Sequence, residues 1–336
     1  MDEYVFEDVL ANSTVTCTYP DLRATRVAHG ISDADERVAA DNGERVAADA
    51  QDGEQLVAEA DERAADAACE SLFFPGCSFL NYGLPLVKAV YDLLHDAGRV
   101  GGISLLCCGK ILQYEDPTGD MRAAFEQQLR EHIVAAGVKR IVAACPNCVG
   151  ALRPLLEADP ATADVQVVAL PAELVEMGYR VDAGVAEEMI RADERVGADG
   201  PAIFCAKDSC PDHKTGEFAE ALRAIMPEGM VVDPEHNRSK SICCGSRPRA
   251  AGNMKGAQKC TRMNADEALA AGAGALVTAC VSCTFLLSTS QRDLPVFHYL
   301  ELLYNWLIAW DYADQYMKLR FLFDDALGTR EFKGLG

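Results

Sequence analysis

Positive charge is scarce in this sequence of 336 residues. Its 31 Lys and Arg side chains face 52 Asp and Glu, which gives a formal net charge of −21. Because nucleic-acid binding depends on Lys and Arg contacts to phosphates, this balance argues against a nucleic-acid partner. Residues 1–70 hold 18 acidic and 5 basic side chains, a net of −13, which leaves −8 for the other 266 residues.

A secretory signal and a long apolar run are also missing. The chain starts MDEYVFEDVL, which is acidic where a signal peptide carries basic residues. The apolar stretch at 300–310 is too short to cross a bilayer and contains Glu301, so we expect a buried helix there. We therefore expect a cytoplasmic protein with no direct membrane span, where structural disulfides are rare.

Composition predicts the domain organisation. Residues 1–70 repeat ERVAAD at 36–41 and 44–49 and offer little apolar surface to bury, so we predict an acidic, low-complexity, disordered extension. A similar phrase at 191–200 predicts an acidic linker over 183–200. We expect domains at 71–182 and 201–312, followed by a C-terminal tail at 313–336.

Between these segments, short apolar strands alternate with amphipathic helices, and the same order occurs twice. The pattern predicts an α/β fold made of two duplicated domains, each a small parallel sheet flanked by helices. The two halves align with an offset of 133 at Cys77 and Cys210, 136 at Cys107 and Cys243, and 135 at Cys145 and Cys280.

Cysteine is abundant, with 14 residues, and ten of these form two matching sets of five. In each set a single cysteine is followed by an adjacent pair with a glycine, in LLCCGK (105–110) or SICCGS (241–246), and then by Cys-x-x-Cys. The first set is Cys77, Cys107, Cys108, Cys145 and Cys148; the second set is Cys210, Cys243, Cys244, Cys280 and Cys283.

Each of these cysteines follows a predicted strand, and ligands collect at the carboxyl ends of parallel strands. A structural zinc ion takes four tetrahedral ligands, which suits a set of five thiols poorly. Disulfides are disfavoured by the expected compartment. Soft thiolates in excess favour iron–sulfur clusters, and a glycine after each pair allows close approach of the backbone or a positive φ. Zinc and disulfides remain the alternatives at this point.

The motifs FFPGC…CCG…ACPNC and KDSC…CCG…ACVSC resemble the duplicated cysteine-rich CCG domains in the B-type subunit of heterodisulfide reductase over residues 72–305. The resemblance implies two CCG domains related by a pseudo-twofold axis. It also implies that the first and second cysteine sets each hold a noncubane [4Fe-4S] cluster. In that family a disulfide is cleaved between the two clusters. The second Cys-Val-Ser-Cys lacks the proline of the first Cys-Pro-Asn-Cys, and SRPRAAG follows the second CCG, so the second pocket is expected to differ.

The function implied is an iron–sulfur redox subunit, foremost the catalytic subunit of a disulfide reductase. The sequence has no ferredoxin-type cysteine run and no flavin or nicotinamide fingerprint, so electrons must come from another protein. The expected partners are a ferredoxin-type subunit resembling the C-type subunit of heterodisulfide reductase, a flavin-containing subunit and a small disulfide substrate. The alternatives are an electron-transfer subunit of a quinone-linked dehydrogenase and a noncatalytic scaffold that carries clusters.

Other side chains near the cysteines have candidate roles. His213 follows Cys210 closely and could give a proton to a departing thiolate, or it could be an ordinary surface histidine. Cys205 is expected to be an ordinary thiol, since its counterpart is Leu72. Cations beside the cysteine turns could bind an anionic substrate or offset cluster charge: Lys110, Lys207, Lys214, Arg247 and Arg249.

Overall fold

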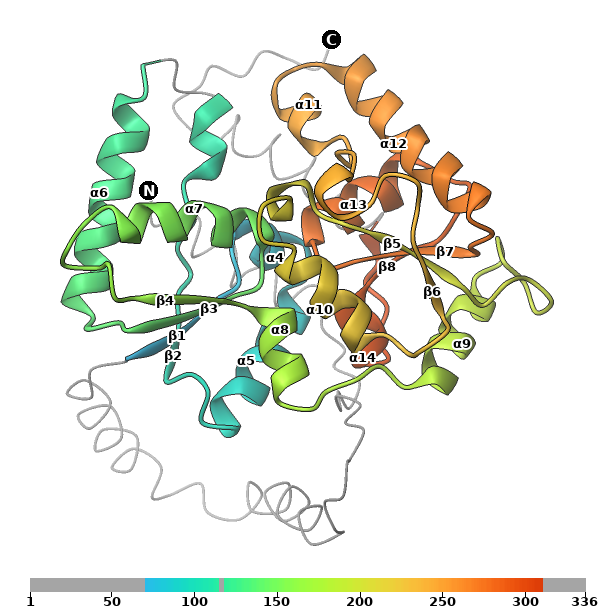
Figure 1. The fold of residues 1–336 in the computed structure, drawn as a ribbon, viewed down its shortest axis with the longest axis horizontal. Helices are drawn as coiled ribbons and strands as arrows, with labels where there is room; N and C mark the ends of the chain where they lie inside the picture. The colour runs from blue at the N-terminus through green and yellow to red at the C-terminus, as the bar shows by residue number, and fades with distance from the viewer. Residues whose placement is uncertain (1–69, 115–117, 311–336) are drawn as a thin grey trace, which may run out of the picture.

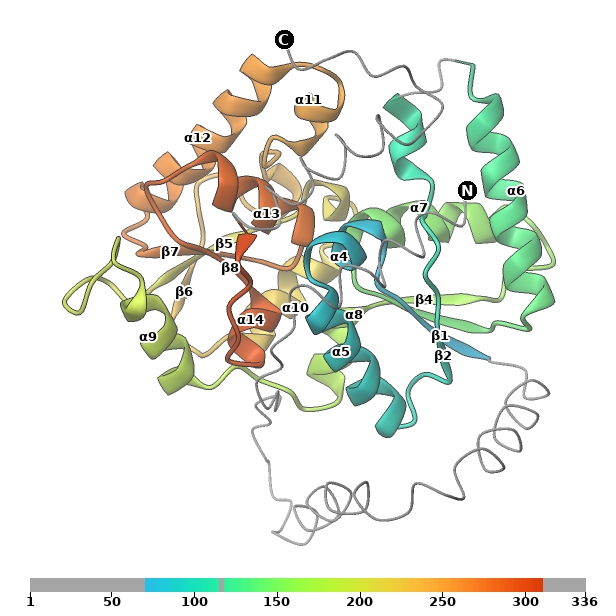
Figure 2. The same ribbon diagram turned by 180° about the vertical axis from the view of Figure 1, so that it is seen from behind.

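The computed structural model describes residues 70–114 and 118–310. Most of the predicted acidic extension and all of the predicted C-terminal tail lie outside the described residues. Figure 1 shows the described chain as two sheets side by side, with the first half coloured blue to green and the second half yellow to red, and Figure 2 shows the same arrangement from behind.

The first half contains one parallel four-stranded sheet with the order β2-β1-β3-β4. Its strands are short and apolar, with Phe73 and Ile141 fully buried, as expected when helices cover both faces of a parallel sheet. The elements are β1 (Ser71–Phe74), α4 (Cys77–Tyr82), α5 (Leu84–Asp96), β2 (Gly102–Ile103), η2 (Lys110–Tyr114), α6 (Asp120–Ala135), β3 (Arg140–Ala143), α7 (Pro146–Glu157), β4 (Gln166–Ala169) and α8 (Leu170–Glu176).

The second half repeats this plan with the strand order β6-β5-β7-β8, again all parallel. Its elements are β5 (Phe204–Lys207), η3 (Cys210–Asp212), α10 (Glu217–Ile225), β6 (Val231–Val232), η4 (Arg238–Lys240), α11 (Ser246–Ala250), α12 (Met254–Ala270), β7 (Ala275–Thr278), α13 (Val281–Ser290), β8 (Val296–His298) and α14 (Tyr299–Leu303). The predicted α/β duplication is therefore confirmed.

Contacts between the halves are reciprocal. Helix α7 of the first half packs on η3 of the second, and α13 of the second packs on α4 of the first. Since η3 and α4 follow equivalent strands, as do α7 and α13, the same surfaces meet twice in the manner of a twofold interface. The Ser282 hydroxyl donates to Ser78 Oγ at 2.8 Å, and the Tyr82 and Phe285 rings stack with centroids 4.1 Å apart.

Two segments differ from the simple expectation. The predicted linker contains a helix, α9 (Ala183–Ala192), which is capped by Asp182 and buries Ala186, Met189 and Ile190. The helix expected at 300–310 ends at Leu303, because Asn305 adopts a left-handed φ of 50°, which a helix cannot continue through. Within the described residues, no helix has the length and hydropathy needed to cross a membrane.

Candidate functional site

The sheet topology gathers the predicted cysteines in two places. Cys77, Cys145, Cys210 and Cys280 each follow the carboxyl end of a central strand, and the adjacent pairs lie in the loops after β2 and β6. Because these strands are parallel, their carboxyl ends meet at one edge of each sheet. Each predicted set of five is therefore assembled from three separate segments of the chain.

Within each set the thiols contact one another in the same order. Hydrogen-bonding contacts run from Cys77 to Cys107, Cys108, Cys148 and finally Cys145. The second set follows the equivalent path from Cys210 to Cys243, Cys244, Cys283 and finally Cys280. The duplication is thus preserved at the level of individual sulfur atoms.

In each set, the first cysteine of the adjacent pair has a lowered pKa and readily loses its proton. Hydrogen bonds from Cys108 and then Cys77 lower the pKa of Cys107 to about 3, and the bond to Cys107 raises the pKa of Cys108 to about 12. In the second set, hydrogen bonds from Cys210 and Cys244 likewise lower the pKa of Cys243. Both sets therefore favour a charged thiolate at the first cysteine of the pair, and the thiolate is the form of cysteine that binds metals.

The glycine after each pair is required by the backbone. Gly109 has φ 72° and Gly245 has φ 112°, which is one of the two roles that the sequence suggested for these glycines. Their N–H groups donate to Cys107 Sγ at 3.4 Å and to Cys243 Sγ at 3.3 Å. A Cβ at Gly109 would lie 2.6 Å from Phe125 Cδ1, and one at Gly245 would lie 2.8 Å from the Ala257 carbonyl oxygen. Both the turn and its packing thus exclude a side chain.

The spread of the sulfur atoms fits a cluster better than a single ion. A tetrahedral zinc with Zn–S bonds of about 2.3 Å would hold its sulfurs within about 4 Å of one another. In the described part of the chain, three ligand atoms all within 4.8 Å occur only at Glu235, His236 and Glu267, and not in either cysteine set. Five soft donors around a wider space match a multi-iron centre.

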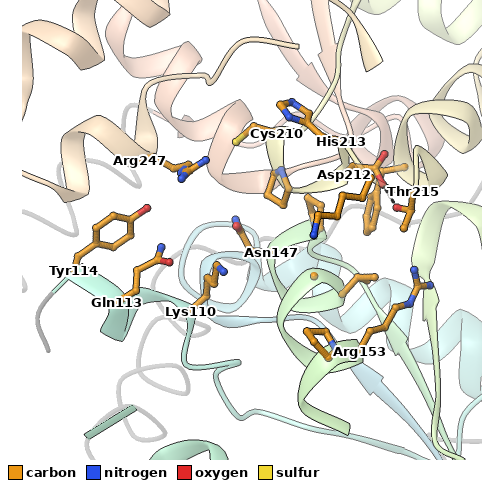
Figure 3. Close-up of a pocket in the computed structure, with 17 residues that line it drawn as sticks. Lys110, Gln113, Tyr114, Asn147, Arg153, Cys210, Asp212, His213, Thr215 and Arg247 are labelled. Atoms are coloured by element: carbon orange, nitrogen blue, oxygen red, sulfur yellow. Dashed lines mark hydrogen bonds between the residues drawn. The ribbon is translucent and has the colours of Figure 1, made fainter. Parts of the chain in front are cut away.

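A cavity of about 510 Å³ lies between the halves beside these sets. Figure 3 shows that η2 and α7 of the first half and η3 and α11 of the second supply its walls. Cys210 lines it directly, as does Asn147 from the Cys-Pro-Asn-Cys turn of the first set. A ligand in this cavity would touch both halves of the molecule.

Positive charge surrounds this cavity. Lys110, Arg153, Lys214 and Arg247 all line it. The Arg247 guanidinium hydrogen bonds to Tyr114 and Cys210, and these groups raise the pKa of Arg247. Figure 3 shows Arg247 extending between Tyr114 and Cys210, so it links the two walls. The remaining predicted cations lie elsewhere: Arg249 is exposed outside this lining, and Lys207 is buried.

Comparison with known proteins agrees with this geometry. The CCG cysteine-rich domain profile matches the sequence twice, at residues 71–153 and 206–288. The chain belongs to the duplicated CCG-domain proteins. No curated protein sequence matches it.

Amino-acid racemases are among the solved structures with some similarity to this chain. Glutamate racemase isoform RacE1 from Bacillus anthracis is 10% identical, with a TM-score of 0.30, covering 77% of this chain and 84% of its own. Glutamate racemase from Aquifex pyrophilus is 14% identical, with a TM-score of 0.31, covering 70% and 81%. At these values the similarity supports no conclusion about function.

His213 lines the cavity of this CCG-domain protein, as a proton donor must, but one ring nitrogen is already engaged. Nε2 lies 2.9 Å from both the carbonyl oxygen and Oγ of Ser241. Nδ1 is therefore the nitrogen that would serve a bound ligand. The proton-donor role of His213 stays a prediction.

Sequence reasoning missed several residues of the cavity. Tyr114, Asn147 and Arg153 line it, although the sequence patterns pointed to none of them as site residues. Asn147 lies inside the Cys-x-x-Cys motif, so its position in the sequence could have identified it as a site residue. Tyr114 and Arg153 reach the cavity only because η2 and α7 of the first half face η3 of the second.

Proposed function

We propose that this protein is an iron–sulfur redox subunit that reduces a disulfide. The observation that carries the proposal is the pair of matching five-thiol sets beside one cavity shared by both halves. Each set would hold one noncubane [4Fe-4S] cluster. The ligands are Cys77, Cys107, Cys108, Cys145 and Cys148 for the first and Cys210, Cys243, Cys244, Cys280 and Cys283 for the second.

Two such clusters supply two single electrons, which is the number that a disulfide requires. The overall balance is one disulfide plus two electrons and two protons, giving two thiols. The protein's own residues bind and orient the substrate: Arg247 and Lys110 attract negative groups, and His213 Nδ1 can hold one of the protons. The proposed electron donor is a ferredoxin-type subunit resembling the C-type subunit of heterodisulfide reductase, which would in turn take its electrons from a flavin-containing subunit.

Metal analysis of anaerobically purified protein tests this proposal. We expect about eight iron and eight acid-labile sulfide per chain, since each [4Fe-4S] cluster holds four of each. Replacing both cysteines of one pair, Cys107→Ser with Cys108→Ser or Cys243→Ser with Cys244→Ser, should remove about half of the iron. Cys260→Ser is the matched control, because this half-buried thiol of α12 belongs to neither set and should leave the iron content unchanged.

Turnover separates the remaining alternatives. Reduction of a small disulfide with an artificial one-electron reductant, lost in both pair variants, supports disulfide reduction. Full iron content with no disulfide reduction, but with oxidation by a quinone, would instead assign the protein to electron transfer. Zinc without sulfide would overturn the proposal.

A further inference from the structure

A buried lysine lies beside the second cysteine set. Lys207 ends β5, three residues before Cys210, and is 4% exposed. Its ammonium donates to the backbone carbonyl of Asp208. The Asp208 carboxylate is itself occupied: Arg223 donates to it at 2.8 and 2.9 Å, and the Arg238 backbone N–H donates at 2.7 Å. Among the described residues, no carboxylate forms an ion pair with Lys207.

Strand geometry places Lys207 on the face that carries the thiols. Side chains two residues apart point to the same face of a strand, so Lys207 shares the face of Cys205. Cys205 packs in a core cluster with Cys244, Cys280 and Cys283, whereas Phe204 and Ala206 pack in the other core. The electrostatic partners of its ammonium are Cys283, Cys244 and Cys210, followed by Asp208, so the lysine lies beside the sulfurs of the second set.

The first set has no charge at the equivalent position. Lys207 pairs with Thr278, two residues before Cys280, and Phe74 pairs with Ala143, two residues before Cys145. Phe74 is 1% exposed, so the position equivalent to Lys207 holds a buried, uncharged ring. The two sets match in their sulfur contacts, but only the second has a buried cation beside it, since Lys207 is the one buried lysine or arginine among the described residues.

We propose that Lys207 sets the redox order of the two halves, so that a centre held by the second set is easier to reduce than one held by the first. A buried cation stabilises the more negatively charged, reduced state, and in a low-dielectric site this attraction is only weakly screened. An electron from the ferredoxin-type donor therefore rests preferentially on the second set, whose Cys210 lines the cavity. This inference rests on the proposed function, because both sets must hold clusters.

A redox titration of the holoprotein, followed by EPR and visible absorption, tests the inference. Wild-type protein should show two midpoint potentials. Lys207→Met should lower the higher one by at least a tenfold change in the reduction equilibrium, about 59 mV for one electron, and leave the lower one unchanged. Lys207→Gln should give the same shift, since it removes the charge but keeps an N–H donor for the Asp208 carbonyl.

Lys214→Met is the matched control. It removes the same charge from an exposed cavity-lining position close to Cys210, where water screens the charge, so both potentials should stay as in the wild type. Equal potentials in wild-type protein, or unchanged potentials in both Lys207 variants at full iron content, would overturn the role of Lys207. Absence of iron and sulfide from the wild-type protein would instead refute the proposed function.

Discussion

At the scale of the residue, the glycines after the cysteine pairs occupy positions where a larger residue would be strained. Gly245 combines a left-handed φ of 112° with a backbone carbonyl, that of Ala257, only 2.8 Å from the position of a Cβ. Because Ala257 belongs to α12, its carbonyl group cannot move aside unless α12 shifts. Gly252 has φ 74° as well, but no atom lies within 4 Å of its Cβ position.

Alanine substitutions at these two glycines distinguish the cost of conformational strain from the cost of steric overlap. Gly252→Ala should lower the free energy of unfolding by about 1–2 kcal/mol, the cost of a left-handed alanine. Gly245→Ala should cost about 1–3 kcal/mol more, because overpacking adds to the same strain. Urea unfolding of the reduced, metal-free variants measures both, and equal losses would show that the turn relaxes freely.

At the scale of the element, the equivalent helices α8 and α14 each bury a glutamate but balance it differently. Glu173 of α8 accepts a hydrogen bond from Arg140 at 2.5 Å. The counterpart of Arg140 is Ala275, so Glu301 of α14 lacks that arginine and accepts from the backbone N–H groups of His298 and Ile308, each at 2.7 Å. Burial raises the pKa of Glu301 to about 8, against the smaller opposing effect of these donors.

The ionisation of Glu301 should make the free energy of unfolding depend on pH. Between the ordinary pKa near 4.5 and the folded-state value of about 8, the folded protein holds a proton at Glu301 that the unfolded chain has released. The free energy of unfolding should therefore fall as pH rises through this window, by at most about 1.4 kcal/mol per pH unit. Urea unfolding from pH 4.5 to 9 measures the slope.

Glu301→Gln should lose this part of the pH dependence. Glu228→Gln, at an exposed position, is the matched control and should keep the wild-type profile. A Glu301→Gln profile identical to that of the wild type would show that the group ionises normally in the folded protein.

At the scale of the whole molecule, the two sheets share one hydrophobic core. Phe73 and Phe204, from the central strands of different halves, belong to the same cluster of buried side chains. The Tyr304 hydroxyl of the second half donates to the Ala89 carbonyl of the first at 3.2 Å. Such continuity predicts that the halves unfold together.

The two tryptophans allow a direct test of this expectation. Trp306 and Trp310 are the only tryptophans in the sequence, and both follow α14, so their fluorescence reports on the second half, whereas far-UV circular dichroism reports on both. The two signals should give the same urea midpoint in the metal-free protein. Phe285→Ala, at the stacked contact with Tyr82, should lower the free energy of unfolding by about 3–5 kcal/mol and shift both midpoints together to lower urea concentration.

The control for this variant is Val134→Ala, an exposed position on α6, which should change stability little. Separate midpoints for fluorescence and circular dichroism would mean that the halves are independent units.

The sequence by itself determined the duplication, the strand–helix order and the two cysteine sets. Repeated Cys-Cys-Gly and Cys-x-x-Cys spacings are local patterns, and parallel strands must gather the residues that follow them at one edge. The positive φ of Gly109 and Gly245 was predictable for the same local reason. The end of α14 was not, because a left-handed Asn305 has no strong sequence signal.

Only the tertiary structure decided what lies between the sets. The cavity exists because α7 and η3 of different halves meet, which brings Arg153, Tyr114 and Cys210 into the lining of one cavity although the spacing of the chain gives no hint of it. The different placement of Lys207 and Lys214, both near Cys210 in sequence, was equally hidden. Lys207 is the last residue of β5, and its side chain points into the core. Lys214 follows the turn after β5 and is exposed, so packing alone separates the buried charge from the exposed one.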